Sequence, residues 1–432
     1  MAENILQVAK SILELQPKYK DLGKQYTFKR FLFDTLIQDL DTSYITGVSG
    51  LRGAGKTVLL LQLLNHLDNS VYISLDTLDP AVDLFKLASI FVQEYKTKYL
   101  LLDEVHFLKH WSRALKMIYD ILQIKVFFTS SVSLDILSTR EDLARRVVIY
   151  KLPVLSYREY LHLFHGIPVP TVDLRQFLDA PNPLVFLERQ LKGVTLLDLD
   201  SNFSEYMKSP LPLFLKKNVQ QTIDTTLEKI ITHDILSIHK LNFEDRLHIY
   251  ETLKFLANME SPDISVSELA KNLGVSRYKM KVYLDLLERA FVVHLVMPYG
   301  KNVLQEPKVL MDLPFRHYLT TLPEKRYLGC FKEDFFVTML KGAGLKIFYL
   351  KNTKGRKTPD YLIELEGKKY IVEIGGKSKG FRQFKGIKEP LPKFVASYPG
   401  FAAGEKITRA EGKKFVSQNG RRVPLFAFGL LY

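Results

Sequence analysis

The segment that most directly implies a chemistry is a glycine-containing loop near residue 50. It has the pattern Gly-x-x-x-x-Gly-Lys-Thr and stands between an apolar run at 44–48 and an apolar helix. Glycines let successive backbone N–H groups curl around a β-phosphate, and the helix N-terminus adds its positive dipole end. Lys56 is expected to reach the β- and γ-phosphates, and the Thr57 hydroxyl to bind Mg²⁺. The predicted nucleotide site consists of Gly50, Gly53, Ala54, Gly55, Lys56, Thr57 and Val58.

Two adjacent acids follow a second apolar run, at 99–102. Asp103 would bind Mg²⁺ through water, and Glu104 could polarise an attacking water. Because the carboxyl end of a buried strand is where an α/β sheet places its ligand chemistry, this pair predicts hydrolysis of the nucleotide rather than binding alone.

A third apolar run ends in hydroxyl side chains at 129–131. We nominate Ser130 as the polar residue that would bond the γ-phosphate or the water. An ordinary cap at the strand end is the alternative interpretation.

Four segments together resemble the prokaryotic and archaeal AAA+-type ATPases whose chains end in a nuclease-like domain. They are the phosphate loop, the acid pair followed by Trp111, the Ser-Ser pair at 130–131, and an L-x-x-R-like segment that leads into a Pro-x-x-Ser-x-Arg-Glu box at 153–160. The resemblance is close over residues 25–165 and looser beyond. It implies an α/β P-loop core with a parallel sheet over residues 1–165, which binds ATP and Mg²⁺.

The same resemblance implies an arginine that senses the γ-phosphate. Arg145 or Arg146 would supply it, and a solvated basic turn is the alternative. An arginine that acts on a neighbouring copy would require a homo-oligomer. The resemblance also gives Lys56 and Glu104 their catalytic roles.

Beyond the core, residues 166–258 show helical patterns that we interpret as the small helical lid and linker. Residues 259–325 have the pattern of a winged helix-turn-helix, in which Ser267 caps a short helix, Gly274 makes the turn and Ser276 begins a second helix. The side chains that would meet DNA from this second helix are Arg277, Tyr278, Lys279 and Lys281. Packing or contact with a protein partner remains open as the role of this element.

Residues 326–432 show the order of elements of a PD-(D/E)XK (restriction-endonuclease-like) α/β nuclease core, where two carboxylates hold Mg²⁺ and a lysine steadies the attacking water. The candidate site consists of Glu333, Asp360, Glu373, Lys377 and Gln383. Gly375 occupies the place of the usual lysine. Either Lys377 reaches back across a glycine bend, or the domain has kept the fold without the chemistry, or the segment is a basic hairpin with no such site.

Charge is distributed unevenly along the chain. Of the 432 residues, 61 are Lys or Arg and 47 are Asp or Glu, and the whole excess of 14 positive charges lies in residues 301–432. A basic segment of this kind predicts contact with a polyanion, of which nucleic acid is the commonest.

The remaining composition favours an intracellular enzyme. The chain has 1 cysteine, so an internal disulfide or a cysteine zinc site is excluded. The N-terminal residues predict an amphipathic helix rather than a signal peptide, and no apolar run is long enough to span a membrane. We therefore expect a cytoplasmic ATPase that acts on DNA, an ATP-regulated nuclease, or an ATP-dependent switch that binds a protein partner.

Overall fold

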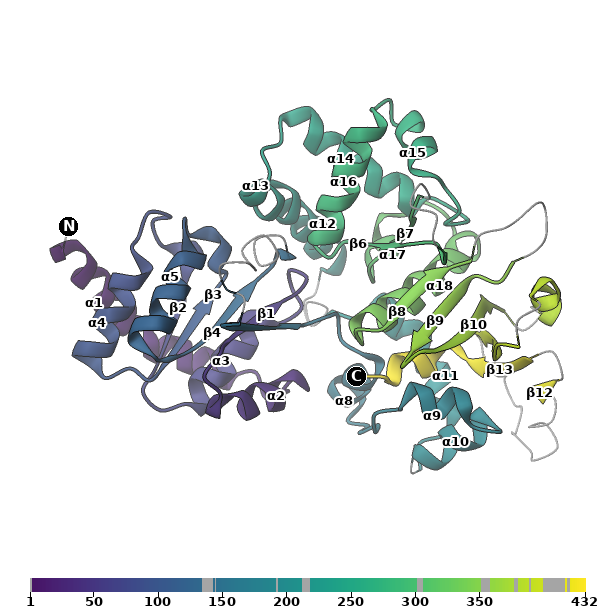
Figure 1. Ribbon diagram of the computed structural model, residues 1–432, viewed down its shortest axis with the longest axis horizontal. Coiled ribbons are helices and arrows are strands. Elements are labelled where there is room, and N and C mark those ends of the chain that lie inside the picture. The colour runs from purple at the N-terminus through teal and green to yellow at the C-terminus, as the bar shows by residue number, and fades with distance from the viewer. Residues whose placement is uncertain are drawn as a thin grey trace. The chain divides into compact units, whose positions relative to one another are not determined.

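The computed structural model describes residues 2–133, 143, 145–191, 193–211, 218–300, 306–350, 358–376, 380–387, 390–398, 416–417 and 420–432. Contacts divide the chain into two compact units, whose elements are labelled in Figure 1. The first unit comprises Met1–Pro153, Asp224–Asn242 and Arg289–Phe291. The second comprises Val154–Ile223, Phe243–Glu288 and Val292–Tyr432.

The first unit is built on a parallel sheet of five strands in the order β2-β3-β4-β1-β5. The strands are β1 (Ile45–Ser49), β2 (Ser70–Ser74), β3 (Tyr99–Asp103), β4 (Lys125–Ser130) and β5 (Val147–Lys151). The central strands β1, β3 and β4 are buried almost throughout, which accounts for their uninterrupted apolar runs. The parallel α/β sheet predicted from the sequence is thus confirmed.

Helices pack around this sheet (Figure 1). They are α1 (Ala2–Lys24), α2 (Leu32–Gln38), α3 (Lys56–His66), α4 (Leu84–Tyr95) and α5 (Trp111–Met117). Phe91 of α4 and Trp111 of α5 join Leu102 and Phe128 of the strands in one buried cluster. Within β1, Gly47 leaves room for the Phe128 ring of this cluster, because an added Cβ at that position would lie 2.5 Å from the ring.

A segment from later in the chain completes the first unit. It includes the end of α12 (Val219–Lys229), a helical turn (Ile230–Asp234) and α13 (Ile235–Ile238). These residues follow part of the second unit in the sequence but make their contacts with the first. The lid expected at 166–258 is therefore divided between the two units.

The second unit begins with α8 (Tyr157–His165), α9 (Leu174–Asp179), α10 (Pro183–Gln190) and α11 (Leu196–Lys208). Ser156 and Glu159 form a capping box at the start of α8. The Tyr157 ring then packs at 5.5 Å from Phe203 and 4.9 Å from Tyr206, both on α11. This aromatic packing places residues 154–165 in the second unit, whereas the sequence led us to expect the core to end at 165.

The expected helix pair follows α14 (Phe243–Ala257) and consists of α15 (Val266–Asn272) and α16 (Arg277–Arg289). Gly274 makes the turn with φ of 65°, and the Ser276 hydroxyl accepts from the backbone of Lys279. Ser265, not Ser267, caps α15, because its side chain accepts from the Glu268 backbone. An antiparallel pair, β6 (Val293–Val296) and β7 (Lys308–Met311), comes next.

The last part of the second unit is a mixed sheet in the order β12-β13-β11-β10-β9-β8, preceded by α17 (Phe315–Leu319) and α18 (Glu324–Gly342). The strands are β8 (Lys346–Tyr349), β9 (Tyr361–Leu365), β10 (Lys368–Gly375), β11 (Lys393–Ser397), β12 (Val416–Ser417) and β13 (Gly420–Pro424). Strand β9 pairs antiparallel with β8 and with β10, whereas β11 pairs in parallel with β10 and with β13. Strand β12 pairs antiparallel with β13. Helix α18 contacts β8 and β10, so it covers one face of this sheet.

Candidate functional site

The predicted phosphate loop joins the end of β1 to the start of α3. Gly53 and Gly55 have φ of 88° and 99°, in the region that glycine adopts without strain. An added Cβ at Gly50 would meet the carbonyl oxygen of Leu152 at 2.1 Å, so that position also excludes larger residues. The guanidinium of Arg30 supports the loop from outside by donating to the carbonyl of Ala54 at 2.6 Å.

Lys56 lies at the first position of α3 and is only 4% exposed. Its Nζ donates to the carbonyl oxygens of Gly50 and Leu51 at 3.0 and 3.2 Å. The same ammonium lies 3.8 Å from Oε1 of Glu104. The loop lysine and the predicted water-activating acid are thus in one site.

Asp103, at the end of β3, accepts three hydrogen bonds from side chains. Thr57 Oγ1 donates to its Oδ2 at 2.7 Å, Tyr72 OH donates to the same oxygen at 2.8 Å, and Thr129 Oγ1 donates to Oδ1. Burial, and then the neighbouring charge of Glu104, raise the pKa of the Asp103 carboxyl. A carboxylate beside a threonine hydroxyl is an oxygen donor pair that suits Mg²⁺, so Thr57 and Asp103 fit the expected ion.

Glu104 has a left-handed backbone, with φ of 54°, and its side chain is 12% exposed. Its backbone N–H donates to Thr129 Oγ1 at 2.9 Å. Its Oε2 accepts from the backbone N–H of Ser131 at 3.0 Å. The end of β4 therefore fixes both the backbone and the carboxylate of Glu104.

The polar residue of β4 that contacts both acids is Thr129. Ser130, which we nominated from the sequence, is fully buried; its Oγ donates to the Val132 carbonyl at 2.8 Å and lies 3.2 Å from His106 Nδ1. Side chains alternate along a strand, so neighbouring residues 129 and 130 face opposite sides of the sheet. The only sequence signal for Thr129 was its place in the run of three hydroxyl residues.

Arg145 and Arg146 lie at the other edge of the sheet. They precede β5, whose first residue Val147 pairs in parallel with Ile45, the first residue of β1. The phosphate loop follows the last of the 5 residues of β1, which places it roughly 16 Å away. Arg146 Nε instead pairs with Asp120 at 2.8 Å. Strand direction therefore keeps both arginines from the phosphate loop of their own copy, contrary to the expectation from the sequence.

Two further titratable side chains near the loop, Asp234 and His106, are buried. Arg52, inside the loop, donates through Nε and Nη2 to the two carboxylate oxygens of Asp234 at 2.9 and 2.5 Å. His106 Nδ1 lies 3.4 Å from Glu104 Oε2, and its Nε2 lies 3.9 Å from Asp234 Oδ1. Asp234 carries no signal in the sequence, because it lies 182 positions after Arg52.

In the second unit, the structure brings three of the predicted nuclease residues into one electrostatic environment. Burial, and then the charges of Glu333 and Glu373, raise the pKa of Asp360 well above its usual value. Asp360 Oδ2 accepts from the backbone N–H of Ile374 at 2.7 Å. Gln383 lies in a short 3₁₀ helix (Phe381–Gly386). Lys377 lies outside the described residues.

A lysine that the sequence did not suggest enters this cluster. Lys308 Nζ, from β7, lies 2.8 Å from Glu333 Oε2 and 3.3 Å from Asp263 Oδ1. Burial alone would lower the pKa of Lys308, but the surrounding carboxylates raise it above its usual value. Among the residues that the structure describes, no three His, Cys, Asp or Glu side chains are arranged to hold a metal ion. In this part of the chain, an ammonium rather than a metal-ready set of ligands balances the acids.

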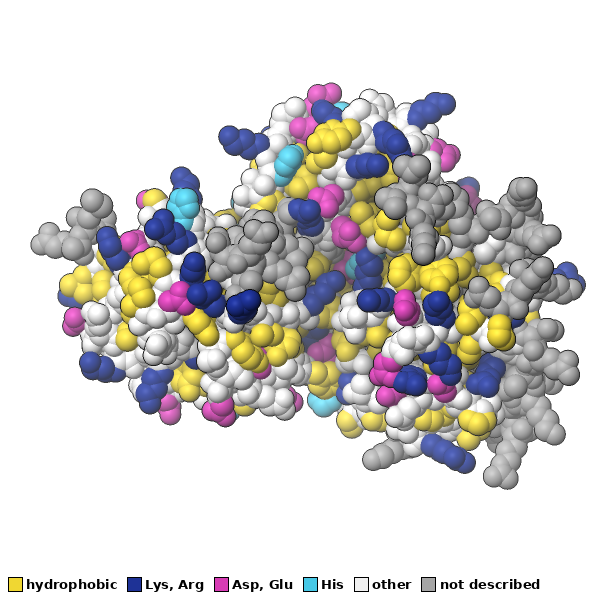
Figure 2. Space-filling model, in the orientation of Figure 1, with side chains coloured by type: hydrophobic (Ala, Val, Ile, Leu, Met, Phe, Trp, Pro, Cys, Tyr) yellow, Lys and Arg dark blue, Asp and Glu magenta, His cyan; other side chains and the backbone are white. Residues whose placement is uncertain are grey.

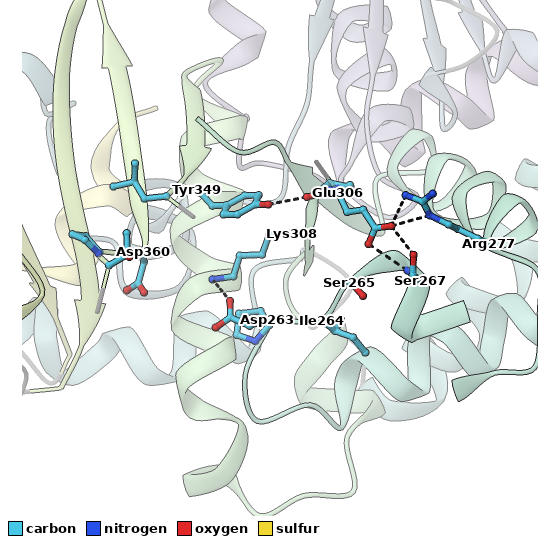
Figure 3. Close-up of a pocket in the computed structure, with 14 residues that line it drawn as sticks. Asp263, Ile264, Ser265, Ser267, Arg277, Glu306, Lys308, Tyr349 and Asp360 are labelled. Carbon is cyan, nitrogen blue, oxygen red and sulfur yellow. Dashed lines mark hydrogen bonds and ion pairs between the residues drawn. The ribbon is translucent and has the colours of Figure 1, made fainter. Parts of the chain in front are cut away.

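Lys308 and Asp360 line a cavity of about 750 Å³, shown in Figure 3. On its other side the cavity is lined by Arg277 of α16, whose Nη2 lies 2.7 Å from Glu306 Oε1. Glu306 also accepts a hydrogen bond from the Ser267 hydroxyl, as Figure 3 shows. Ser267, which we expected to cap a helix, therefore orients this acid instead. The start of α16 and Asp360 therefore line one cavity.

The four predicted DNA-contacting residues are all exposed. Tyr278 is 77% exposed, whereas Lys279 pairs with Asp245 at 3.0 Å. On the face drawn in Figure 2, Lys and Arg side chains alternate with Asp and Glu. Many basic residues of 301–432, including Lys377, lie outside the described part of the chain. The structure therefore locates only part of the positive charge excess of this segment.

Within the described residues, no helix has the length and apolar content needed to cross a membrane.

Comparisons with known proteins agree with the geometry of the first unit. Residues 42–161 match the model of the AAA domain, and residues 212–324 match a domain of unknown function (DUF8612). The loop, the acid pair and the parallel sheet thus belong to a nucleotide-binding domain that is similar to the AAA domain over residues 42–161.

Two relatives extend over most of the chain. An uncharacterised protein of Methanocaldococcus jannaschii is 28% identical over 392 residues, which cover 82% of this chain and 81% of the relative. An uncharacterised protein of Haemophilus influenzae is 25% identical over 335 residues, covering 71% of this chain and 76% of the relative.

Similar solved structures are distant. A signal transduction ATPase with a tetratricopeptide repeat sensor from Pyrococcus horikoshii has a TM-score of 0.26 and 13% identity, and the match covers 74% of this chain but 47% of that one. A DNA polymerase III gamma subunit-related protein from Thermotoga maritima has a TM-score of 0.27 and 15% identity, covering 60% of this chain and 99% of that one. Scores this low carry no functional argument.

Proposed function

We propose that this protein binds ATP with Mg²⁺ at the loop of residues 50–57 and hydrolyses it. The observation that carries the proposal is the meeting of Lys56, Thr57, Asp103 and Glu104 at one edge of the parallel sheet. These residues come from two separate segments of the chain, and each has a distinct task in phosphoanhydride hydrolysis.

The chain's own residues would act as follows. Backbone N–H groups of the loop bind the β-phosphate, and Lys56 leaves the carbonyl oxygens of Gly50 and Leu51 to neutralise the γ-phosphate. Glu104 accepts a proton from the attacking water, which the buried carboxylate can do only while it is ionised.

Thr57 and Asp103 would hold the magnesium ion. Bound there, Mg²⁺ supplies positive charge that stabilises the phosphate oxygens. The bonds from Tyr72 and Thr129 keep the Asp103 carboxylate directed toward Thr57.

The test separates nucleotide binding from turnover. Lys56→Ala should lose nucleotide binding, measured by titration with a fluorescent ATP analogue. Glu104→Gln should bind the analogue normally but release phosphate at least about a hundredfold more slowly. The matched controls are Lys86→Ala and Glu94→Gln, at exposed positions of α4. Normal turnover by Glu104→Gln would refute the role of Glu104, and tight binding by Lys56→Ala would refute the phosphate loop.

We further propose that turnover is coupled to a nucleic acid held by residues 259–325 and 326–432, acting as a winged helix and a nuclease-like domain. The support is the helix pair α15 and α16 followed by the β6–β7 hairpin, and the positive charge excess confined to residues 301–432. Phosphate release should then rise on addition of DNA, and DNA binding should weaken steeply with salt. Binding that is independent of salt, with no stimulation, would contradict this coupling.

A second candidate function is metal-dependent cleavage of DNA. Its support is that the charges of Glu333 and Glu373, after burial, raise the pKa of the Asp360 carboxyl. Labelled DNA incubated with the protein and Mn²⁺ should then be cut, and Asp360→Asn should abolish cutting while leaving ATP turnover intact. Intact DNA in every sample would restrict this domain to binding.

A further inference from the structure

We propose that Asp234 and His106 are positioning residues through which residues 224–242 control Glu104. The proposal deepens the proposed ATP hydrolysis and rests on it. In the first unit, Asp234 pairs with Arg52 of the phosphate loop and lies 3.9 Å from His106, which lies 3.4 Å from the catalytic acid Glu104.

The contact with the loop is an ion pair between a fully buried acid and a partly exposed guanidinium. Asp234 has no exposed side-chain surface, and its two oxygens each receive a hydrogen from Arg52. Arg52 stands between Leu51 and Gly53, so its side chain is fixed to the same backbone that curls around the phosphates. A buried carboxylate is costly to separate from its cation, so Asp234 stays paired with the Arg52 side chain during small movements of its own segment.

The contact with the acid passes through one imidazole. Neither ring nitrogen of His106 is exposed; Nδ1 faces Glu104 Oε2 at 3.4 Å and Nε2 faces Asp234 Oδ1 at 3.9 Å. Burial lowers the pKa of His106 to about 4, so the ring is neutral near pH 7 and carries one N–H. Ser130 Oγ also lies 3.2 Å from Nδ1, and Ser131 Oγ lies 3.5 Å from Nε2. The ring hydrogen is therefore directed either to the side of Glu104 and Ser130 or to the side of Asp234 and Ser131, but not to both.

This choice gives the site two distinct arrangements. In the present one the ring lies nearer to Glu104 than to Asp234. A movement of Asp234 by about 1 Å would bring it within hydrogen-bond distance of Nε2. The ring hydrogen would then be directed to Asp234, and Glu104 would lose this potential donor while keeping the Ser131 backbone N–H and the Lys56 ammonium 3.8 Å away.

The segment that carries Asp234 is suited to transmit such a movement. At both ends, residues 224–242 continue in the chain into residues of the second unit. A rearrangement there, for example on binding nucleic acid, would act on Asp234 through the covalent backbone. The inferred regulation is therefore a change in the rate of hydrolysis, with little change in ATP affinity.

The experiment measures affinity and turnover separately in full-length variants. Asp234→Asn and His106→Ala should each lower kcat by about ten- to a hundredfold, as expected when a catalytic group is misplaced by an ångström, while the Kd for a fluorescent ATP analogue changes less than about threefold. His106→Asn keeps an amide near the Nδ1 position and should recover part of the lost kcat. The double variant should be no slower than the slower single variant, because the two residues act in one sequence.

Exposed residues nearby provide the controls. His66→Gln and Asp68→Asn lie in the same unit and should turn over ATP like the wild type. If Asp234→Asn does not fold, Asp234→Glu serves instead, since it keeps the charge but shifts the carboxylate by about 1.5 Å. A lower kcat in Asp234→Glu would then be the supporting result.

The outcomes distinguish this inference from the proposed function. Wild-type turnover that is lost in Glu104→Gln but unchanged in the Asp234 and His106 variants would overturn the inference and leave the ATPase. Equal losses of kcat and affinity would also overturn it, because they indicate a merely structural role. A wild type without turnover would overturn the proposed function itself.

Discussion

The Thr57 hydroxyl donates to the Asp103 carboxylate at 2.7 Å, which joins residues 46 positions apart in the sequence. Thr57 is the second residue of α3, which follows the phosphate loop, and Asp103 is the last residue of β3. Their contact shows that the two predicted motifs form a single site. It also identifies Thr57 and Asp103 as the side chains whose removal should weaken the binding of Mg²⁺ rather than the contacts with the phosphates.

Thr57→Ala should weaken ATP binding in the presence of Mg²⁺ and leave binding in EDTA nearly unchanged, because only the hydroxyl ligand is lost. We expect a loss of about 1–3 kcal/mol in the Mg²⁺-dependent part of the binding free energy. Thr57→Ser, which keeps the hydroxyl, is the matched control. Equal weakening with and without Mg²⁺ would indicate damage to the loop instead.

Thr129→Val removes the hydroxyl that bonds both Asp103 and the backbone of Glu104. The free energy of unfolding should fall by about 1–3 kcal/mol, since buried polar groups lose a partner, and kcat should fall as well. Urea unfolding and phosphate release measure the two effects. Thr129→Ser should retain most of both properties, and a serine variant as impaired as valine would contradict the assigned contacts.

Lys308→Met should destabilise the protein by about 3–5 kcal/mol, because it leaves the Glu333 carboxylate buried without its cation. Adding Glu333→Gln removes that charge and should restore much of the loss. Urea unfolding of the single and double variants forms the cycle, with Lys346→Met at an exposed position as the control. Purely additive losses would show that the pair is not coupled.

The burial of His106 predicts a pH dependence of stability. Its pKa is about 4 in the native protein, against an ordinary value of 6.5, so the unfolded chain takes up this proton first as pH falls. Relative to His106→Gln, the wild type should therefore lose about 2 kcal/mol of unfolding free energy between pH 7 and pH 5. The free energies of unfolding of the wild type and of His106→Gln should therefore converge or cross over this range. A constant difference between them would refute the buried, neutral state of the ring.

Strand direction explains which site residues the sequence could not place. Arg145 and Arg146 follow the core motifs in the chain, but they stand before β5, at the amino edge of parallel strands. Thr129 and Ser130 are equivalent hydroxyl residues in a sequence, yet alternation along β4 sends one to the acids and the other to His106. Neither result follows from residue type or spacing.

The sequence by itself determined the phosphate loop and the acid pair, because both depend on local rules: glycines that permit a tight loop, and apolar runs that must end where polar ligands begin. Only the tertiary structure decided that Asp234 pairs with Arg52 and that Lys308 lies beside the acids Glu333 and Asp360. These partners meet through chain segments far apart in sequence. A buried charge requires a partner but does not specify from which segment it comes.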